Sequence, residues 1–234
     1  MAAKTTVIKH VTIYSAYLVL IWAFYRFLFD LPDQVEELVI KPIVWLIPIF
    51  WLNHKEGFSL SSLGLTLKNL FPAIYLSLGL GAIFVLEAVL TNFFKYGRFN
   101  FAANIGNIPI LTSLGISFAT AFSEEVSFRG FIFGRLWYAL EDEWAANITS
   151  SLIWTLVHVP IAFFVWKLDL VSGILYLFLT AVFGMGSAFV FGRTKNIFGS
   201  TNNCLKVSIK NGWQKQIYRI VANLMIVGKN LSKW

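Results

Sequence analysis

Long apolar runs separated by short polar stretches dominate this chain of 234 residues. A bilayer core about 30 Å thick takes roughly 20 apolar residues for one helical crossing. Because unsatisfied backbone groups are costly in hydrocarbon, runs of this length should be helices. The pattern therefore predicts an all-α, polytopic transmembrane bundle of about six helices, over residues 11–29, 39–52, 70–94, 109–138, 144–166 and 170–192.

Composition supports a membrane protein and argues against a soluble domain, a disulfide-linked fold and a cysteine-based zinc site. Hydrophobic residues make up 57% of the chain and charged residues 13%, with a mean hydropathy of +0.69, which lies outside the usual range of soluble domains. The single cysteine, Cys204, excludes an internal disulfide and a cysteine-based zinc knuckle. The first run follows two lysines but lacks a small-residue cleavage site, so we expect a retained anchor.

The net charge of +7 is most simply a signal of membrane topology. Lys4 and Lys9 precede the first run and acidic residues at positions 30, 33, 36 and 37 follow it, which predicts a cytoplasmic amino terminus. We separately expect the membrane to be a bacterial cell membrane. Basic residues at 95 and 98 oppose this orientation, and those at 193 and 195 support it. Arg26, near the end of the first run, is expected to snorkel toward the membrane surface.

The segment AFSEEVSFRG places two adjacent carboxylates, Glu124 and Glu125, near the middle of the fourth run. Charged groups at that depth cost at least a few kcal/mol unless they face protein or water. Arg129 follows Glu125 at the i,i+4 spacing, so one helical turn predicts an ion pair. Glu124 should point about 100° away around the helix and face a second partner.

That partner is predicted to be His158, in the segment IWTLVHVP of the fifth run. Trp154 lies one turn earlier on the same face, and Pro160 should open the backbone just beyond. A glutamate and a histidine in a water-filled hollow can polarise a water, either as a base with its orienting partner or as ligands of a zinc ion. Both arrangements suit hydrolysis.

Each feature also has a simpler structural interpretation. The pair of Glu125 and Arg129 can be a buried brace between helices, and a lone intramembrane histidine more often makes a hydrogen bond across a helix interface. Their combination at one depth on neighbouring segments favours chemistry. A proton relay in a transporter is a third interpretation, although we find no inverted repeat of broken helices.

The chain resembles the CPBP family, the type II CAAX prenyl proteases and their bacterial relatives linked to bacteriocin processing and immunity, also called Abi proteins. EEVSFRG fits the family's EExxxR motif, and WTLVH fits its FxxxH motif with Trp154 in place of phenylalanine. The pieces SLSSLGLTLKNL and FLTAVFGMGSAFVFGRTKNIFG are also similar to family segments. The resemblance thus covers roughly residues 60–199.

This resemblance implies an intramembrane endopeptidase in which Glu124 is the general base and His158 its partner or a metal ligand. Glu125 and Arg129 would support them. Whether Glu124 and His158 hold zinc or the glutamate acts without a metal stays open. The implied partners are the lipid bilayer and a peptide or lipidated protein substrate, sometimes a prenylated carboxyl terminus, and not a nucleic acid.

The last 35 positions depart from the family pattern. A final helix with an HxxxN motif is expected there, but the tail 200–234 contains no histidine and carries scattered lysines. We therefore divide the chain into a transmembrane domain, 1–199, and a divergent basic tail in which 216–227 forms either a short surface helix or a loosely ordered end. A truncated or frameshifted reading and a lineage without the last helix are both open explanations. So is the alternative function, a catalytically inactive immunity or scaffold protein.

Overall fold

The computed structural model describes residues 2–29, 31–97 and 110–198, and every regular element among them is helical. The tail 200–234, with its predicted surface helix, lies outside the described residues. Four elements are π-helical or 3₁₀ (η), and the others are α-helices. In chain order they are α1 (Lys4–Leu28), α2 (Asp33–Val35), η1 (Glu36–Ile40), α3 (Lys41–Lys55), η2 (Leu60–Leu63), α4 (Leu70–Tyr96), α5 (Ile110–Glu124), η3 (Glu125–Phe133), α6 (Gly134–Leu140), α7 (Glu143–Pro160), η4 (Ile161–Val165) and α8 (Leu170–Thr194).

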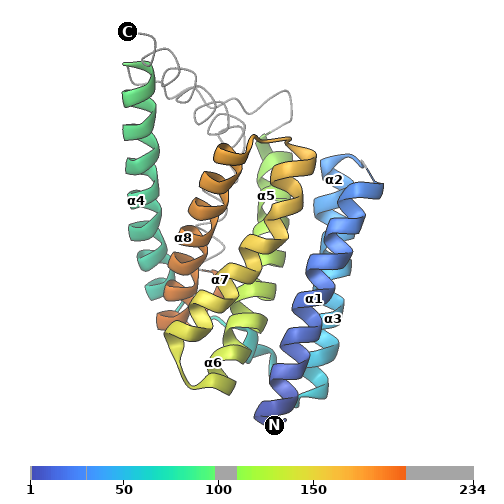
Figure 1. Ribbon diagram of the computed structural model, residues 1–234. Helices are drawn as coiled ribbons and strands as arrows, with labels where there is room; N and C mark the ends of the chain where they lie inside the picture. The colour runs from blue at the N-terminus through green and yellow to red at the C-terminus, as the bar shows by residue number, and fades with distance from the viewer. Residues whose placement is uncertain (1, 30, 98–109, 199–234) are drawn as a thin grey trace.

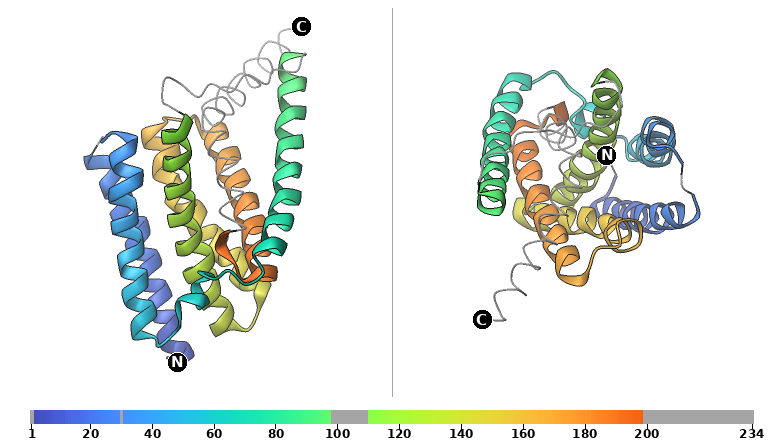
Figure 2. Two further views of the ribbon diagram at one scale, coloured as in Figure 1. Left: turned by 180° about the vertical axis from the view of Figure 1, so that it is seen from behind. Right: turned by 90° about the horizontal axis from the view of Figure 1, so that it is seen from above.

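The long helices run side by side as one bundle (Figure 1). Helices α1 and α3 form one side, α5 and α7 the middle, and α8 with α4 the other side, an order that is also seen from behind and from above (Figure 2). Helix α7 packs extensively on α8, and η3 contacts α7, α5, α3 and η2. The segment that begins at Glu125 therefore lies in the centre of the bundle.

Among the residues that the structure describes, three helical stretches are long and apolar enough to cross a membrane: Lys4–Leu28, Glu143–Val165 and Leu170–Thr194. Large apolar side chains on their outer faces are exposed, among them Leu20, Phe24, Leu152 and Phe178. In lipid such faces are solvated by hydrocarbon rather than by water. The predicted all-α membrane bundle is confirmed, and the protein is an integral membrane protein.

The predicted fourth segment, 109–138, corresponds to a helical rod described from Ile110 to Leu140, which changes its winding at the acidic doublet. The α-helical part ends at Glu124, and the π-helix η3 continues from Glu125 to Phe133. π-Helical turns are rare and occur frequently at functional sites. The predicted fifth segment changes in the same way, because Pro160 ends α7 and the π-helix η4 follows.

A line of aromatic rings connects the side formed by α1 and α3 with the middle of the bundle. Trp22 of α1 meets Trp45 of α3 edge to face, with ring centroids 5.3 Å apart. Trp45 lies 5.7 Å from Phe128 of η3, which in turn lies 6.3 Å from Trp154 of α7. These contacts are in the range of favourable aromatic pairs and fix the rotation of η3 relative to α3 and α7.

The segment that precedes α4 and the segment that follows α8 are joined by hydrogen bonds at one end of the bundle. Asn196 donates from Nδ2 to the carbonyl oxygens of Thr66 and Lys68, at 2.7 and 2.8 Å. Asn69 donates from Nδ2 to the carbonyl oxygen of Thr194 at 3.1 Å. The two stretches that extended the sequence resemblance, SLSSLGLTLKNL and RTKNIFG, are therefore held together at one end of the bundle.

Gly130 of η3 lies against the backbone of η2, so a larger residue at this position should destabilise the protein. A Cβ added at Gly130 would lie 2.5 Å from the carbonyl oxygen of Leu63, so an alanine must displace the backbone. We expect Gly130→Ala to lower the free energy of unfolding by about 1–3 kcal/mol. Gly115 is the matched control, since a Cβ there meets nothing within 4 Å.

Thermal unfolding of the purified protein in detergent checks this prediction. Gly115→Ala should leave the midpoint unchanged or raise it, because alanine has the higher helix propensity. Equal midpoints for Gly130→Ala and the wild type would contradict the close packing of η2 on η3.

Candidate active site

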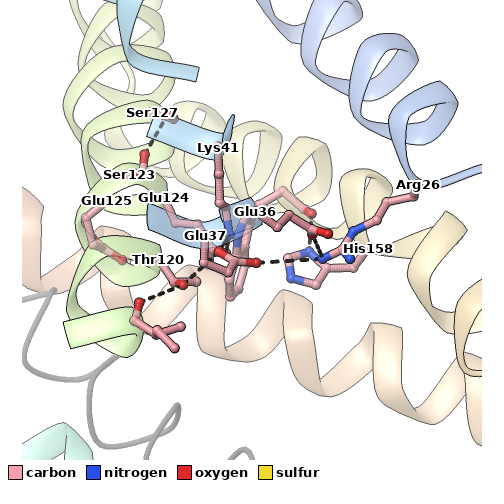
Figure 3. Close-up of polar contacts among 12 residues, drawn as sticks. Arg26, Glu36, Glu37, Lys41, Thr120, Ser123, Glu124, Glu125, Ser127 and His158 are labelled. Carbon is pink, nitrogen blue, oxygen red and sulfur yellow. Dashed lines mark hydrogen bonds and ion pairs between the residues drawn. The ribbon is translucent and has the colours of Figure 1, made fainter. Parts of the chain in front are cut away.

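Glu124, the last residue of α5, forms an ion pair with a lysine from a distant part of the chain. Its Oε1 atom lies 2.7 Å from Nζ of Lys41, the first residue of α3. Lys41 also donates to Oε2 of Glu37, at 3.0 Å. Thr120, one turn before Glu124, donates from its hydroxyl to the same Oε2 atom at 2.7 Å. Figure 3 shows these side chains gathered between η1, α3 and α5.

Arg26 of α1 extends this cluster by pairing with both acids of η1. Its Nη2 atom contacts Oε1 of Glu36 and lies 3.7 Å from Oε1 of Glu37. The guanidinium also lies over the ring of Trp22, 5.2 Å from the ring centroid. The expectation that Arg26 snorkels to the surface is therefore wrong, because its partners are in the protein and Glu36 is buried.

Glu125 and Arg129 form the ion pair that their spacing predicts. Figure 3 shows Glu125 pointing away from Lys41. Oε1 of Glu125 lies 3.4 Å from Nη1 of Arg129, and both side chains are almost fully buried. Arg129 donates from Nη2 to the carbonyl oxygen of Gly184 at 3.4 Å, and its guanidinium lies 4.5 Å from the ring centroid of Trp154. Arg129 thus connects η3 with α7 and α8.

His158 lies in the last turn of α7 with its ring orientation set by neighbours. Nδ1 lies 2.8 Å from the carbonyl oxygen of Trp154, and because a carbonyl only accepts, Nδ1 carries the hydrogen. The imidazole stands edge to face on the ring of Trp154 at 4.9 Å, as the one-turn spacing predicts, and 6.1 Å from Tyr176. This arrangement directs Nε2 away from its own helix turn.

Glu124 and His158 both lie in the polar region around Lys41, and Glu125 is turned away from it (Figure 3). Lys41, rather than His158, is the direct ion-pair partner of Glu124, which the sequence analysis did not anticipate.

The residues of this site do not fit the zinc centre that was one of the two open interpretations. Among the described residues, no group of three or more histidine, cysteine, aspartate or glutamate side chains is placed to hold a metal ion. Glu124 and His158 would supply only two ligands, and the ammonium group of Lys41 already occupies Oε1 of Glu124. A cation at 2.7 Å disfavours a second cation at the same oxygen. The hydrolysis that we propose for this site therefore passes no step through a metal ion.

Lys41, Glu37 and Arg26 are the residues that sequence reasoning missed. One signal was available, since Glu37 and Lys41 are spaced i,i+4 with the acid first, the favourable order for a helical ion pair. In the sequence pattern, the acids of this stretch indicate only membrane topology. Their convergence on Glu124 depends on the packing of η1 and α3 against α5.

Comparison with known proteins finds a family match over the segment that carries the two motifs. Residues 106–201 match the protein family described as type II CAAX prenyl endopeptidase, Rce1-like. The match includes EEVSFRG of α5 and η3 and WTLVH of α7, and it does not extend to Lys41. No curated protein and no solved structure is found to match the chain. Through its residues 106–201, which carry both motifs, the chain is similar to the type II CAAX prenyl endopeptidase Rce1-like family.

Proposed function

We propose that this protein is an intramembrane endopeptidase that hydrolyses peptide bonds of membrane-associated substrates with a water activated by Glu124 and His158. The observation that carries the proposal is that Glu124 and His158, one from each of the two motifs, lie in the same polar region around Lys41 (Figure 3). Glu124 is less deeply buried than Glu125, with 12% of its side chain exposed against 0%. Glu124 is therefore the acid of the doublet that a substrate and a water can reach.

The proposed chemistry assigns one role to each group. A water placed between the two side chains gives one hydrogen bond to Glu124 and the other to Nε2 of His158, so that an oxygen lone pair faces the substrate carbonyl. As the new C–O bond forms, Glu124 takes the proton of the water. When the C–N bond breaks, Glu124 returns that proton to the leaving nitrogen, which yields an acid and an amine.

The membrane setting favours a substrate with an apolar portion. The bundle exposes wide apolar faces, so a peptide with a lipid chain or an apolar segment reaches it within the bilayer. Each buried methylene contributes about 0.8 kcal/mol to such binding. We propose a prenylated CAAX-type carboxyl terminus or a bacteriocin-type peptide as the substrate, with the amino terminus of the protease in the cytoplasm.

Cleavage of reporter peptides by the purified protein in lipid nanodiscs tests the proposal. One peptide ends in a farnesylated CAAX sequence and the other is an unmodified peptide with one apolar membrane segment, and mass spectrometry identifies the new termini. We expect His158→Ala to lower kcat about 10²-fold, since it removes one of the two groups that hold the water. His54, an exposed histidine of α3, is the matched control.

His54→Ala should retain the wild-type rate. Absence of cleavage by folded wild-type protein with either peptide would overturn the proposed function. A wild-type rate in folded His158→Ala would overturn the role given to His158.

A non-catalytic membrane protein, with an immunity or scaffold role, is the second candidate. The contact between Lys41 and Oε1 of Glu124 favours it, because this pair satisfies one oxygen of the proposed base with a group from the same chain. The lack of an HxxxN motif in the tail 200–234 also favours a non-catalytic role. Under this alternative, binding of the partner protein survives both Glu124→Gln and His158→Ala, and no peptide is cleaved.

A further inference from the structure

We infer that Lys41 is a positioning residue of the active site, which holds Glu124 as an oriented carboxylate for the proposed hydrolysis. The inference rests on the proposed function and extends it to a residue outside the family-matched segment. Lys41 belongs to α3, whereas both motifs belong to α5, η3 and α7.

The first argument is the way in which Lys41 is held. Its side chain is only 4% exposed and its ammonium group bridges two carboxylates, Glu37 at 3.0 Å and Glu124 at 2.7 Å. The rings of Trp45 and Trp22 lie 4.9 and 5.7 Å from Nζ, at distances where an aromatic face attracts a cation. A lysine is normally flexible, but these four neighbours restrict Nζ to one position.

The second argument is the use of a single oxygen of Glu124. Lys41 binds Oε1, and among the described residues no donor reaches Oε2. A carboxylate fixed through one oxygen presents the lone pairs of the other in a defined direction. Oε2 is therefore the atom that would take the proton of the water, with its direction set by the contact at Oε1.

The third argument concerns charge. The cluster formed by Arg26, Glu36, Glu37, Lys41 and Glu124 contains two cations and three carboxylates. Without Lys41, Glu124 and Glu37 would face each other across the position of the ammonium group. The like charges of two neighbouring carboxylates disfavour the ionised form of both, and only the ionised form of Glu124 can act as a base.

Lys41 also has a role after proton transfer. When Glu124 becomes neutral, the negative charge has moved to the oxygen of the tetrahedral intermediate, and the Lys41 ammonium remains in the same low-dielectric site. A fixed cation near a developing anion favours the transition state over the ground state. Loss of Lys41 should therefore lower kcat more than it changes KM.

Steady-state cleavage in nanodiscs tests this with Lys41→Met, Lys41→Arg and the exposed control Lys55→Met on the same helix. We expect Lys41→Met to lower kcat about 10²-fold with KM within about threefold, and Lys41→Arg to restore kcat to within about tenfold of the wild type. Lys55→Met should match the wild type. If Lys41→Met does not fold, Glu37→Gln replaces it, with kcat expected to fall about tenfold at constant KM because Lys41 loses its second anchor.

A double-mutant cycle, measured by thermal unfolding, tests the contact between Lys41 and Glu124 without substrate. Lys41→Met should lower the unfolding midpoint on the order of 10 °C, and adding Glu124→Gln should recover most of the loss, since no buried charge then lacks its counter-charge. If the wild type cleaves no peptide, the proposed function fails. The pairing of Lys41 with Glu124 is tested separately, and it would be overturned if the midpoint changes of Lys41→Met and Glu124→Gln simply added in the double variant. A folded Lys41→Met protein with unchanged or increased kcat overturns the positioning role, and an increase would show that Lys41 blocks Glu124 instead.

Discussion

Glu124→Gln should reduce kcat for reporter-peptide cleavage by about 10⁴-fold and leave the helical bundle intact. Glutamine has nearly the same shape and keeps an oxygen that accepts a hydrogen bond from Lys41, but it cannot take a proton from water. Removal of a general base typically costs between 10² and 10⁴ in rate, and we expect the upper end because Glu124 both takes the proton and returns it. The measurement is single-turnover cleavage with excess enzyme, which separates chemistry from product release.

The second acid of the doublet provides the internal comparison for this result. Glu125→Gln changes a carboxylate that points away from Lys41 and contacts Arg129, so its effect should appear mainly in stability. Glu141, an exposed residue between α6 and α7, is the surface control, and Glu141→Gln should cleave at the wild-type rate. Equal losses of kcat in Glu124→Gln and Glu125→Gln would contradict the assignment of Glu124 as the base. Proton uptake by vesicles that depends on Glu124, without cleavage, would instead support the transporter interpretation.

Arg129→Met should lower the free energy of unfolding by about 3–5 kcal/mol. Arg129 is buried, lies 3.4 Å from Glu125 and contacts Gly184 of α8 and the ring of Trp154. Methionine fills much of the same volume but leaves a buried carboxylate without the cation at its side, and such single removals are strongly destabilising. Chemical denaturation in mixed micelles, followed by tryptophan fluorescence, measures the loss.

Arg193 of α8 is the matched control for this prediction. It pairs with Glu143 at 3.3 Å, but 49% of its side chain is exposed. Arg193→Met should therefore cost no more than about 1 kcal/mol, the usual limit for an exposed pair. Arg129→Lys should recover only part of the lost stability. A planar guanidinium can lie over the Trp154 ring and donate to the Gly184 carbonyl oxygen at the same time, whereas an ammonium group cannot. A stability of Arg129→Met equal to that of Arg193→Met would contradict the bracing role.

Several parts of the site could be predicted from spacing alone. The pairing of Glu125 with Arg129 and the edge-to-face contact of Trp154 with His158 are contacts within one helix, where i,i+4 neighbours meet whatever the rest of the fold does. The divergence of Glu124 from Glu125 follows from the same geometry. The roles of Glu124 and His158 in catalysis stay predictions until cleavage is measured.

The sequence by itself determined the helical membrane bundle, because apolar runs of this length have no other low-energy state in lipid. It also determined the local pairs on single helices and the similarity to the Rce1-like family over residues 106–201, which the two motifs carry. Only the tertiary structure decided which distant groups meet Glu124. The ammonium group of Lys41 comes from 83 positions away along the chain, and Arg26 reaches the same cluster from α1. Such contacts depend on how α1, η1 and α3 pack against α5, and the period of a helix carries no information about the packing partner of a distant segment.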